Sequence, residues 1–373
     1  MHIDPFGVEQ WMNAFETKCE YNLAETCVWS LTLAELLGLA GADVGGDVFA
    51  PLMDRAITYG DITGSPQLRG LIAGLYAQQT ADNVLVAHGT IGANALVYQA
   101  LVGPDDVVVS VVPTYQQHVS LPQALGATVR QVALQADENY VLDMQRLGDA
   151  AKGAKLIVLV NPNNPTGALL DRDALMQVVD IARANNSWIL ADEVYRGTNQ
   201  QGGGSTVSVA DLYERGISTG SMSKAFALAG LRLGWIVGPK EILTNAEIHR
   251  DYNTISVGMF DDHLATLALT AADKILDRSR AIVRTNHAIV SDWIATQNAV
   301  TWVPPQGGTT ALLQYAQGGP SYELAVRMLN ETGVLVTPGS VLGAEGTLRL
   351  GYANRTNVLI QGLDRMGAFL AGQ

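Results

Sequence analysis

The chain has 373 residues, of which 48% are hydrophobic and 16% charged, and 23 Lys and Arg against 36 Asp and Glu give a net charge of −13. This composition excludes a disordered or fibrous protein, and the negative charge argues against binding to nucleic acid or to an anionic membrane surface. A chain of this length exceeds what one hydrophobic core usually holds, so we expect two domains.

The N-terminal segment contains both cysteines, Cys19 and Cys27, and no matching cluster of His or Cys. This spacing fits neither a disulfide framework nor a zinc site. The first residues lack the basic and apolar regions of a signal peptide, and no segment reaches the ~20 apolar residues of a membrane span. We therefore expect a cytoplasmic protein with reduced thiols and no bound metal. Helical patterns follow at residues 31–39 and 66–79.

Short β-branched runs alternate with longer amphipathic stretches in the central part of the chain. The runs predict strands at residues 83–87, 106–112, 128–134, 155–160, 187–191, 217–220 and 233–237. Helical patterns lie between several of them, for example at residues 171–185. Runs that are apolar on both faces and separated by helices predict an α/β fold with a mostly parallel sheet covered by helices.

The C-terminal part carries a different pattern. A long helical pattern at residues 261–296 is followed by strands at 302–315 and 334–351, with a helix at 322–332 between them. We predict a large domain over residues 46–280. The remaining residues, 1–45 and 281–373, are predicted to form a smaller α+β domain.

Polar residues follow the predicted strands, and ligands of open α/β sheets bind beyond the carboxyl ends of the strands. Each residue alone has a plainer interpretation, such as a tight turn, a helix cap or a solvated surface charge. Together they form one chemical set. Its members are Gly89, Thr90, Ile91, Tyr115, Asn164, Asp192, Tyr195, Ser221, Ser223, Lys224 and Arg232.

This set suits an anionic aromatic cofactor that carries an aldehyde, namely pyridoxal 5′-phosphate (PLP). A lysine forms a Schiff base and then acts as general base, and a carboxylate keeps the ring nitrogen protonated. A phenol and an amide contact the ring oxygen. Serine, arginine and backbone N–H groups at the start of a helix bind the phosphate.

Three motifs make the sequence similar to the class I/II aminotransferases of PLP fold type I. They are Asn163-Asn164-Pro165-Thr166-Gly167, Asp192-Glu193-Val194-Tyr195, and Ser221-Met222-Ser223-Lys224 followed by Arg232-Leu233-Gly234-Trp235. The resemblance implies that Lys224 forms the Schiff base and that Asp192 contacts the ring nitrogen. It also implies ring-oxygen contacts from Asn164 and Tyr195, stacking by Tyr115, and phosphate contacts from Ser221, Arg232 and the backbone at Thr90 and Ile91.

Two further segments extend the resemblance. Tyr59-Gly60-Asp61 is similar to the family segment whose tyrosine reaches the phosphate of a neighbouring subunit, which implies a homodimer with shared active sites. The segment around Arg349 resembles the one whose arginine binds the substrate α-carboxylate, a task that suits a two-pronged guanidinium.

The N-terminal segment departs from the family, because it lacks the short glycine-bearing loop that many members carry over the substrate. By analogy Glu25, Thr26 and Trp29 lie near the substrate side chain, together with Asn164; the alternative is an N-terminal strand and a helix cap. No motif places a second arginine at the side-chain end of the pocket, where it would bind the second carboxylate of a dicarboxylate substrate. Glu25, Thr26 and Trp29 favour a substrate with an aromatic, sulfur-containing or basic side chain.

The reaction itself has alternatives. We expect amino transfer between an α-amino acid and a 2-keto acid, but a C–S lyase or a cyclising enzyme would use the same motifs. A ligand-responsive regulator is disfavoured, because no helix-turn-helix extension is visible. A nicotinamide-dependent dehydrogenase is also disfavoured, since no Gly-x-Gly-x-x-Gly joins a strand to a helix.

Overall fold

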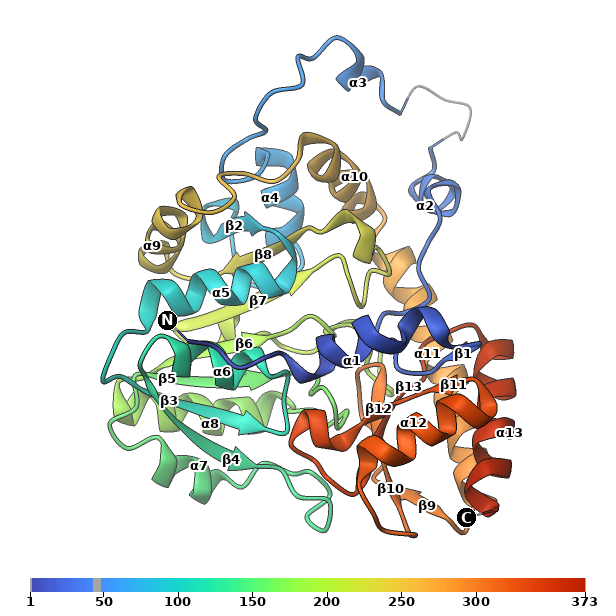
Figure 1. Ribbon diagram of the computed structural model, residues 1–373. Coiled ribbons are helices and arrows are strands. Elements are labelled where there is room, and N and C mark those ends of the chain that lie inside the picture. Colours follow the sequence, from blue (N-terminus) through green and yellow to red (C-terminus); the bar gives the residue numbers. More distant parts are fainter. Residues whose placement is uncertain (1, 43–47, 373) are drawn as a thin grey trace.

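The computed structural model describes residues 2–42 and 48–372, which form three sheets with helices around them (Figure 1). The larger sheet has seven strands in the order β2-β8-β7-β6-β5-β3-β4. All neighbours in it are parallel except those of β8, which is antiparallel to β2 and β7. The prediction of a mostly parallel sheet is therefore confirmed. The strands are β2 (Val84–Ala87), β3 (Val107–Val112), β4 (Thr128–Ala133), β5 (Leu156–Val160), β6 (Trp188–Asp192), β7 (Gly216–Ser221) and β8 (Gly234–Val237).

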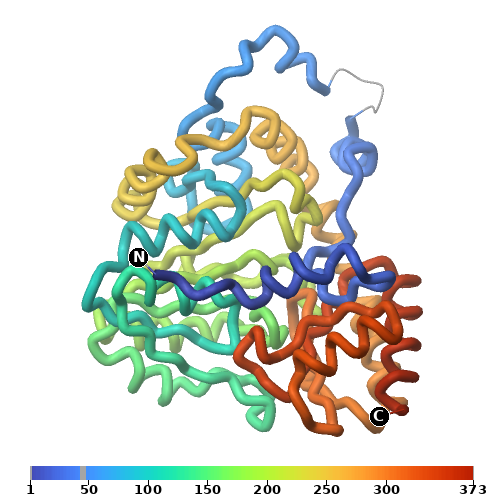
Figure 2. The backbone as a smooth tube through the Cα atoms, viewed as in Figure 1, coloured from blue at the N-terminus to red at the C-terminus, as the bar shows by residue number. Residues whose placement is uncertain are grey.

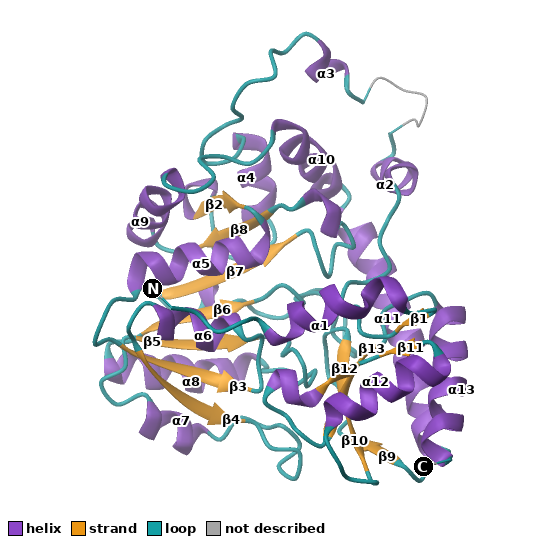
Figure 3. Ribbon diagram, viewed as in Figure 1, coloured by secondary structure: helices purple, strands orange, loops and turns teal. Residues whose placement is uncertain are grey.

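Alternate residues of these strands pack in two different hydrophobic cores. Ile157 and Leu159 of β5 pack with α7 (Met144–Ala150) and α8 (Arg172–Asn185), whereas Leu156 and Val158 pack with α5 (Gly89–Leu101) and α9 (Lys240–Asp251). Successive strand residues point to opposite faces, so a strand that is apolar throughout must be covered on both sides. Figure 3 shows this order of helix, sheet and helix, with α6 (Gln117–Ala124) beside α5.

The smaller sheet is antiparallel, with the order β12-β13-β10-β9. Beside it, β1 pairs in parallel with β11. One core joins Trp11 and Leu23 near the N-terminus to Val283 and Leu363 near the C-terminus, so the two ends of the chain pack together. The exact domain boundaries stay a prediction. The elements are β1 (Tyr21–Asn22), β9 (Val300–Trp302), β10 (Thr310–Tyr315), β11 (Val334–Leu335), β12 (Thr337–Pro338), β13 (Thr347–Gly351), α11 (Ala272–Ala295), α12 (Ser321–Thr332) and α13 (Thr356–Ala371).

The structure corrects two predicted helices and adds several that were not predicted. The pattern at 261–296 is two helices, α10 (Met259–Thr270) and α11, because Ala271 leaves the helical conformation with φ −113° and ψ 23°. The helix from residue 66 stops early, as α4 (Pro66–Ala73), and the N–H groups of Ala77 and Gln78 donate to the Asp211 carboxylate instead. The helix α1 (Gly7–Phe15) was not predicted.

The chain around α3 (Ala50–Met53) lies apart from the sheets, whereas α2 (Leu33–Ala40) packs against α10 and buries Leu36. Figure 2 shows the chain around α3 extending away from the body of the molecule. Large apolar side chains are exposed on it, among them Met53, Ile57 and Tyr59. In the part of the chain that the structure describes, no helix combines the length and the apolar character needed to cross a membrane.

Candidate active site

A cavity of about 440 Å³ opens at the carboxyl ends of β5, β6 and β7. It brings together thirteen residues that the sequence predicted for the site, from segments far apart in the chain. These are Glu25, Thr26, Thr90, Ile91, Tyr115, Asn164, Asp192, Tyr195, Ser221, Ser223, Lys224, Arg232 and Arg349. Gly89, also predicted, lies directly before Thr90 at the start of α5.

Lys224 follows β7 and points its amine at the N-terminal segment. Its Nζ donates to Thr26 Oγ1 at 2.7 Å and to Cys27 Sγ at 3.3 Å, and lies 3.9 Å from Glu25 Oε1. Burial disfavours the ammonium form, but the side chains of Cys27, Tyr195 and Glu25 outweigh it and raise the pKa of Lys224. The amine is therefore held by weakly acidic and acidic partners at one end of the cavity.

Asp192, the last residue of β6, is held by groups that the sequence did not identify. Its Oδ2 accepts from Asn94 Nδ2 at 2.8 Å and lies 3.3 Å from His118 Nε2. On the other side of the ring, His118 Nδ1 lies 2.8 Å from the hydroxyl of Tyr98. Asp192, His118 and Tyr98 are all buried, so the carboxylate has a fixed position and orientation.

The start of α5 forms a cradle that suits a phosphate. No N-cap side chain caps this helix, and of its first turn only the Gly92 N–H is paired, with the His88 carbonyl, so the N–H groups of Gly89, Thr90 and Ile91 point to the cavity end without a helical partner. The Arg232 guanidinium lies so close that a Cβ on Gly89 would stand 2.9 Å from its Nη2. The buried Oγ1 of Thr90 has no hydrogen-bond partner, and no described carboxylate lies within 4.0 Å of Arg232. Unpaired cationic and donor groups at a helix N-terminus fit a phosphate.

Two serines complete this cradle. Ser221 Oγ accepts from the N–H of Ser223 at 3.2 Å, and Ser223 Oγ accepts from Arg232 at 3.5 Å. Ser221 is the last residue of β7, and Ser223 lies in the loop between that strand and Lys224. The loop therefore brings the phosphate ligands and the lysine to the same edge of the sheet.

Arg349 lies on β13 of the smaller sheet and is 2% exposed. Its guanidinium donates to Asn164 Oδ1 at 3.3 Å, to the Ala24 carbonyl at 3.1 Å and to Thr337 Oγ1 at 3.1 Å. Its Nε has no partner, and none of the described carboxylates forms an ion pair with it. Burial lowers the pKa of Arg349. A buried cation without a counter-ion fits an anionic group of a ligand.

Two tyrosines line the middle of the cavity. The Tyr115 hydroxyl donates to Glu9 Oε1 at 2.8 Å, and its ring lies 4.6 Å from that of Phe6, centroid to centroid. Tyr195 is 3% exposed. Burial raises the pKa of both phenols, so each keeps its proton at neutral pH. Tyr195 can therefore donate a hydrogen bond to a bound ring, whereas the proton of Tyr115 is donated to Glu9.

The structure does not bring every predicted residue to the cavity. Trp29 does not line it; the Arg355 guanidinium covers its ring at 3.8 Å from the centroid. Tyr59 is 70% exposed on the extended segment and contacts nothing in the cavity of its own chain. Conversely, Glu9 and Glu16 of the unpredicted N-terminal segment do line it. The helical spacing of Val8, Trp11, Met12 and Phe15 was a short signal for that segment.

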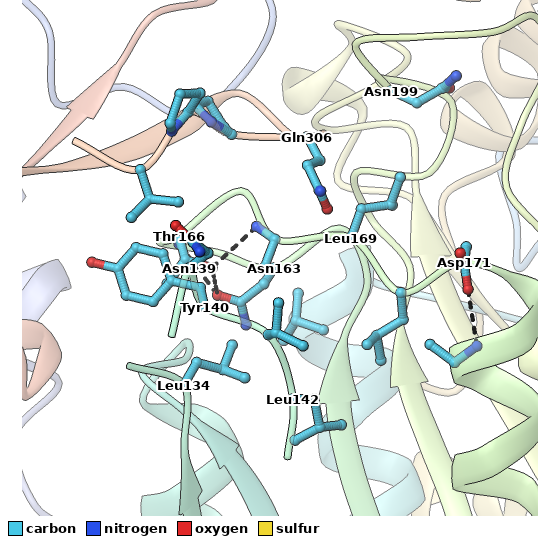
Figure 4. Close-up of a pocket in the computed structure, with 18 of the residues that line it drawn as sticks. Leu134, Asn139, Tyr140, Leu142, Asn163, Thr166, Leu169, Asp171, Asn199 and Gln306 are labelled. Atoms are coloured by element: carbon cyan, nitrogen blue, oxygen red, sulfur yellow. Dashed lines mark hydrogen bonds between the residues drawn. The ribbon is translucent and has the colours of Figure 1, made fainter. Parts of the chain in front are cut away.

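A second cavity of about 740 Å³ lies on the other side of the loop after β5 (Figure 4). Asn163 and Thr166 line it and are joined by a hydrogen bond of 2.8 Å, whereas Asn164 lines the cavity with Lys224. Lys224, Arg232 and Arg349 do not line the larger cavity. The lysine and the two arginines predicted for the site therefore belong to the smaller cavity alone. Among the described residues no group of three His, Cys, Asp or Glu is arranged to hold a metal.

Comparisons with known proteins agree with this geometry. The family described as "Aminotransferase class I and II" matches residues 51–363. Capreomycidine synthase of Streptomyces vinaceus is 29% identical over 95% of this chain and 91% of its own length. Arginine–pyruvate transaminase of Pseudomonas aeruginosa is 28% identical over 85% of each protein. The crystal structure of a PLP-dependent aminotransferase from Streptococcus suis superposes with a TM-score of 0.96 at 35% identity, covering 100% of this chain and 99% of that one.

Proposed function

Because this chain belongs to the class I and II aminotransferase family, an enzyme family of PLP fold type I, we propose that it transfers an amino group between an α-amino acid and a 2-keto acid. Its cofactor is PLP. When bound, PLP supplies an aldehyde that reacts with amines and a ring that withdraws electrons. We assign Lys224 as the residue to which it is attached.

The residues present would hold PLP at each of its polar groups. Thr90, Ser221 and Arg232 would bind the phosphate, together with the N–H groups of Gly89, Thr90 and Ile91. Asp192 would face the ring nitrogen, with Asn164 and Tyr195 at the ring oxygen and Tyr115 against the ring. These assignments are implied by the family, and the chemistry of the donors and their common cavity support them.

One observation carries this proposal: two cations without carboxylate partners, Arg232 and Arg349, line a single cavity with Lys224. The cofactor and the substrate each bring one anion, a phosphate and an α-carboxylate. Arg349 would hold the carboxylate in a fixed orientation, and Lys224 would remove the proton from the substrate Cα. The Asp192 carboxylate would keep a proton on the ring nitrogen throughout.

A cyclising or eliminating reaction is the second candidate, and the similarity to capreomycidine synthase over 95% of this chain favours it. All of these reactions begin with removal of the same Cα proton. They differ in whether a leaving group departs before a proton returns, and the residues described above serve either course.

The test is an assay of the PLP-loaded protein against a panel of amino acids, with and without an added keto acid. Keto acid formation that requires the acceptor supports amino transfer. Ammonia or pyruvate without an acceptor identifies a lyase, and a cyclic product that keeps the amino group identifies a cyclase. Borohydride should fix the cofactor to Lys224, and peptide mapping that found it on another lysine would contradict the assignment of that residue.

A further inference from the structure

We propose that the side-chain end of this substrate site is built for a basic amino acid, whose terminal guanidinium or ammonium group faces Glu9, Glu16 and Glu25. We call these three residues the acidic wall. The inference rests on the proposed function, since it takes the cavity as an amino acid site. The inference adds to that function the chemical class of the substrate's side chain.

The acidic wall faces the cavity from two neighbouring segments. Glu9, Met12 and Glu16 are spaced i, i+3 and i+7 along α1 and the turn after it, so they share one face, and all three line the cavity. Glu25 joins them from the segment after β1. Figure 1 shows α1 running from the edge of the larger sheet toward the C-terminal helices. The apolar side chains of Val8 and Met12 lie on the same lining, where they suit the methylene stem of a basic side chain.

Two of the three carboxylates of the acidic wall lack a cationic partner among the described residues. Within the described ranges neither Glu9 nor Glu16 forms an ion pair, and Glu25 lies 3.9 Å from Lys224. Tyr115 and two backbone N–H groups fix Glu9 and Glu25 in place. Partial burial, together with the charges of Glu25 and Glu9, raises the pKa of Glu16, so these carboxylates are close enough to repel one another. A cation among them would relieve that repulsion.

The opposite side of the cavity fixes which part of a substrate reaches the acidic wall. The buried Nε of Arg349 has no partner and fits the α-carboxylate, while Lys224 marks the position of Cα. The side chain is then the substituent left to extend toward α1. A second carboxylate there would meet like charge, whereas a guanidinium would complete the pairing.

A binding experiment tests the charge preference without any reaction. 5-Guanidinopentanoate and its neutral analogue 5-ureidopentanoate keep the carboxylate and the stem of a basic amino acid but have no α-amine. Calorimetric titration of the PLP-loaded protein should give at least about tenfold tighter binding of the guanidino compound, and the ratio should fall as salt rises. Equal affinity for the two compounds would overturn the inference.

Variants locate the preference in the acidic wall. Glu9→Gln keeps an acceptor for the Tyr115 hydroxyl, and the exposed Glu16 can be changed to Gln or Lys with little risk to folding. The guanidino-to-ureido affinity ratio should fall toward one in the Gln variants and below one in Glu16→Lys. The exposed Glu323→Gln on α12 is the matched control and should keep the original ratio. Unchanged ratios in the wall variants would contradict the inference.

Turnover separates this inference from the proposed function. With an acceptor present, arginine should exceed citrulline in kcat/KM by about tenfold or more. Amino transfer in which citrulline equals arginine would overturn the basic-substrate inference and leave the proposed function standing. A guanidino preference in binding, with no amino transfer from any donor, would overturn the proposed function and keep the inference.

Discussion

The Asp192 carboxylate, at the end of a strand, is held in place by polar residues that lie behind it. Asn94 donates to its carboxylate, and the His118 ring stands between it and Tyr98. Because this chain of polar groups is buried and fully occupied, the carboxylate cannot turn away from the cavity. We expect the negative charge of Asp192 to be the property that keeps the ring nitrogen of PLP protonated.

Replacing Asp192 by Asn therefore tests charge at nearly constant shape. The Asp192→Asn protein should still bind PLP, because the phosphate cradle is intact, but kcat should fall by about a hundredfold to a thousandfold or more, as when a catalytic electrostatic partner is removed. Steady-state kinetics and the cofactor absorbance measure the two effects. Asp143→Asn, at the exposed cap of α7, is the control. A variant within tenfold of the wild-type kcat would contradict this role.

The geometry of Arg349 gives a second prediction. Arg349→Lys keeps the positive charge, but an ammonium cannot make the two parallel bonds of a guanidinium to a carboxylate. We expect KM to rise for every amino acid donor by about tenfold or more, which corresponds to roughly 1.4 kcal/mol. Arg365→Lys, an exposed partner of Glu20, serves as the control. A KM that changed for one donor alone would show that Arg349 contacts the side chain and not the carboxylate.

Cys27 permits a prediction of pH dependence. Burial raises the pKa of its thiol to about 11, despite the nearby Lys224. The reactive thiolate is then rarer at pH 8 than in a free thiol by roughly two powers of ten, and it becomes commoner as pH rises toward 11. In a Cys19→Ser variant, alkylation of Cys27 by iodoacetamide should be correspondingly slow at pH 8 and accelerate about tenfold per pH unit. A rate at pH 8 equal to that of the unfolded protein would contradict the shift.

The sequence predicts site residues well where they follow strands, since parallel strands end at one edge and bring Asn164, Asp192 and Lys224 together. Asn94 and His118 could not be found in this way. They lie inside α5 and α6, where a polar residue normally indicates a solvent-facing position, and only the packing of these helices on the sheet turns them toward Asp192.

At the scale of elements, the contact between β8 and α5 positions the phosphate cradle. A Cβ on Gly234 would stand 2.4 Å from the backbone carbon of Gly89 and 2.7 Å from the carbonyl oxygen of Gly220. Neither neighbour is a flexible side chain, so the strand or the helix start must move. The close approach of these backbones therefore requires glycine at this position.

Gly234→Ala should displace the start of α5 and weaken PLP binding by about tenfold or more, an effect in the range of ~1–3 kcal/mol that overpacking costs. The thermal midpoint of unfolding should fall as well. Gly230→Ala is the matched control, because a Cβ there meets no atom within 4 Å. Normal cofactor affinity in Gly234→Ala would show that the cradle does not depend on this contact.

Strands of the larger sheet were predicted to within one or two residues, because burial on both faces produces short apolar runs rich in β-branched residues. Helices were predicted less well. The pattern at 261–296 continues through Ala271 because α10 and α11 both bury faces of similar spacing, so the sequence carries no sign of the break. The nine-residue α1 is too short for its period to stand out, so Glu9 within it and Glu16 directly after it were missed.

A single copy of the chain leaves several large apolar side chains exposed to solvent. Met53, Ile57 and Tyr59 are exposed by 74%, 83% and 70% on the segment that extends from the body (Figure 2). Burying such residues would be favourable by roughly 25 cal/mol per Å² of apolar area. A second copy of this chain would cover them and, by the two-fold symmetry usual in homodimers, receive the same segment in return.

A homodimer with shared sites is therefore expected, in which Tyr59 of one subunit reaches the phosphate cradle of the other. The test mixes two defective proteins. Lys224→Ala removes the lysine from its own site, and Tyr59→Phe removes a hydroxyl from the neighbouring site. In a hybrid dimer one site then has both residues intact, and the other has neither.

After unfolding and joint refolding of equal amounts, half of the dimers should be hybrids with one intact site, so the activity recovered should approach about a quarter of wild type. Each variant refolded alone sets the baseline, and sedimentation measures the assembly state. The test requires that the activity of Tyr59→Phe refolded alone lie well below a quarter of wild type. This must be checked because that variant keeps Lys224. An active monomer, or activity that only averages the two parents, would mean that each site is complete within one chain and that the exposed segment serves another purpose.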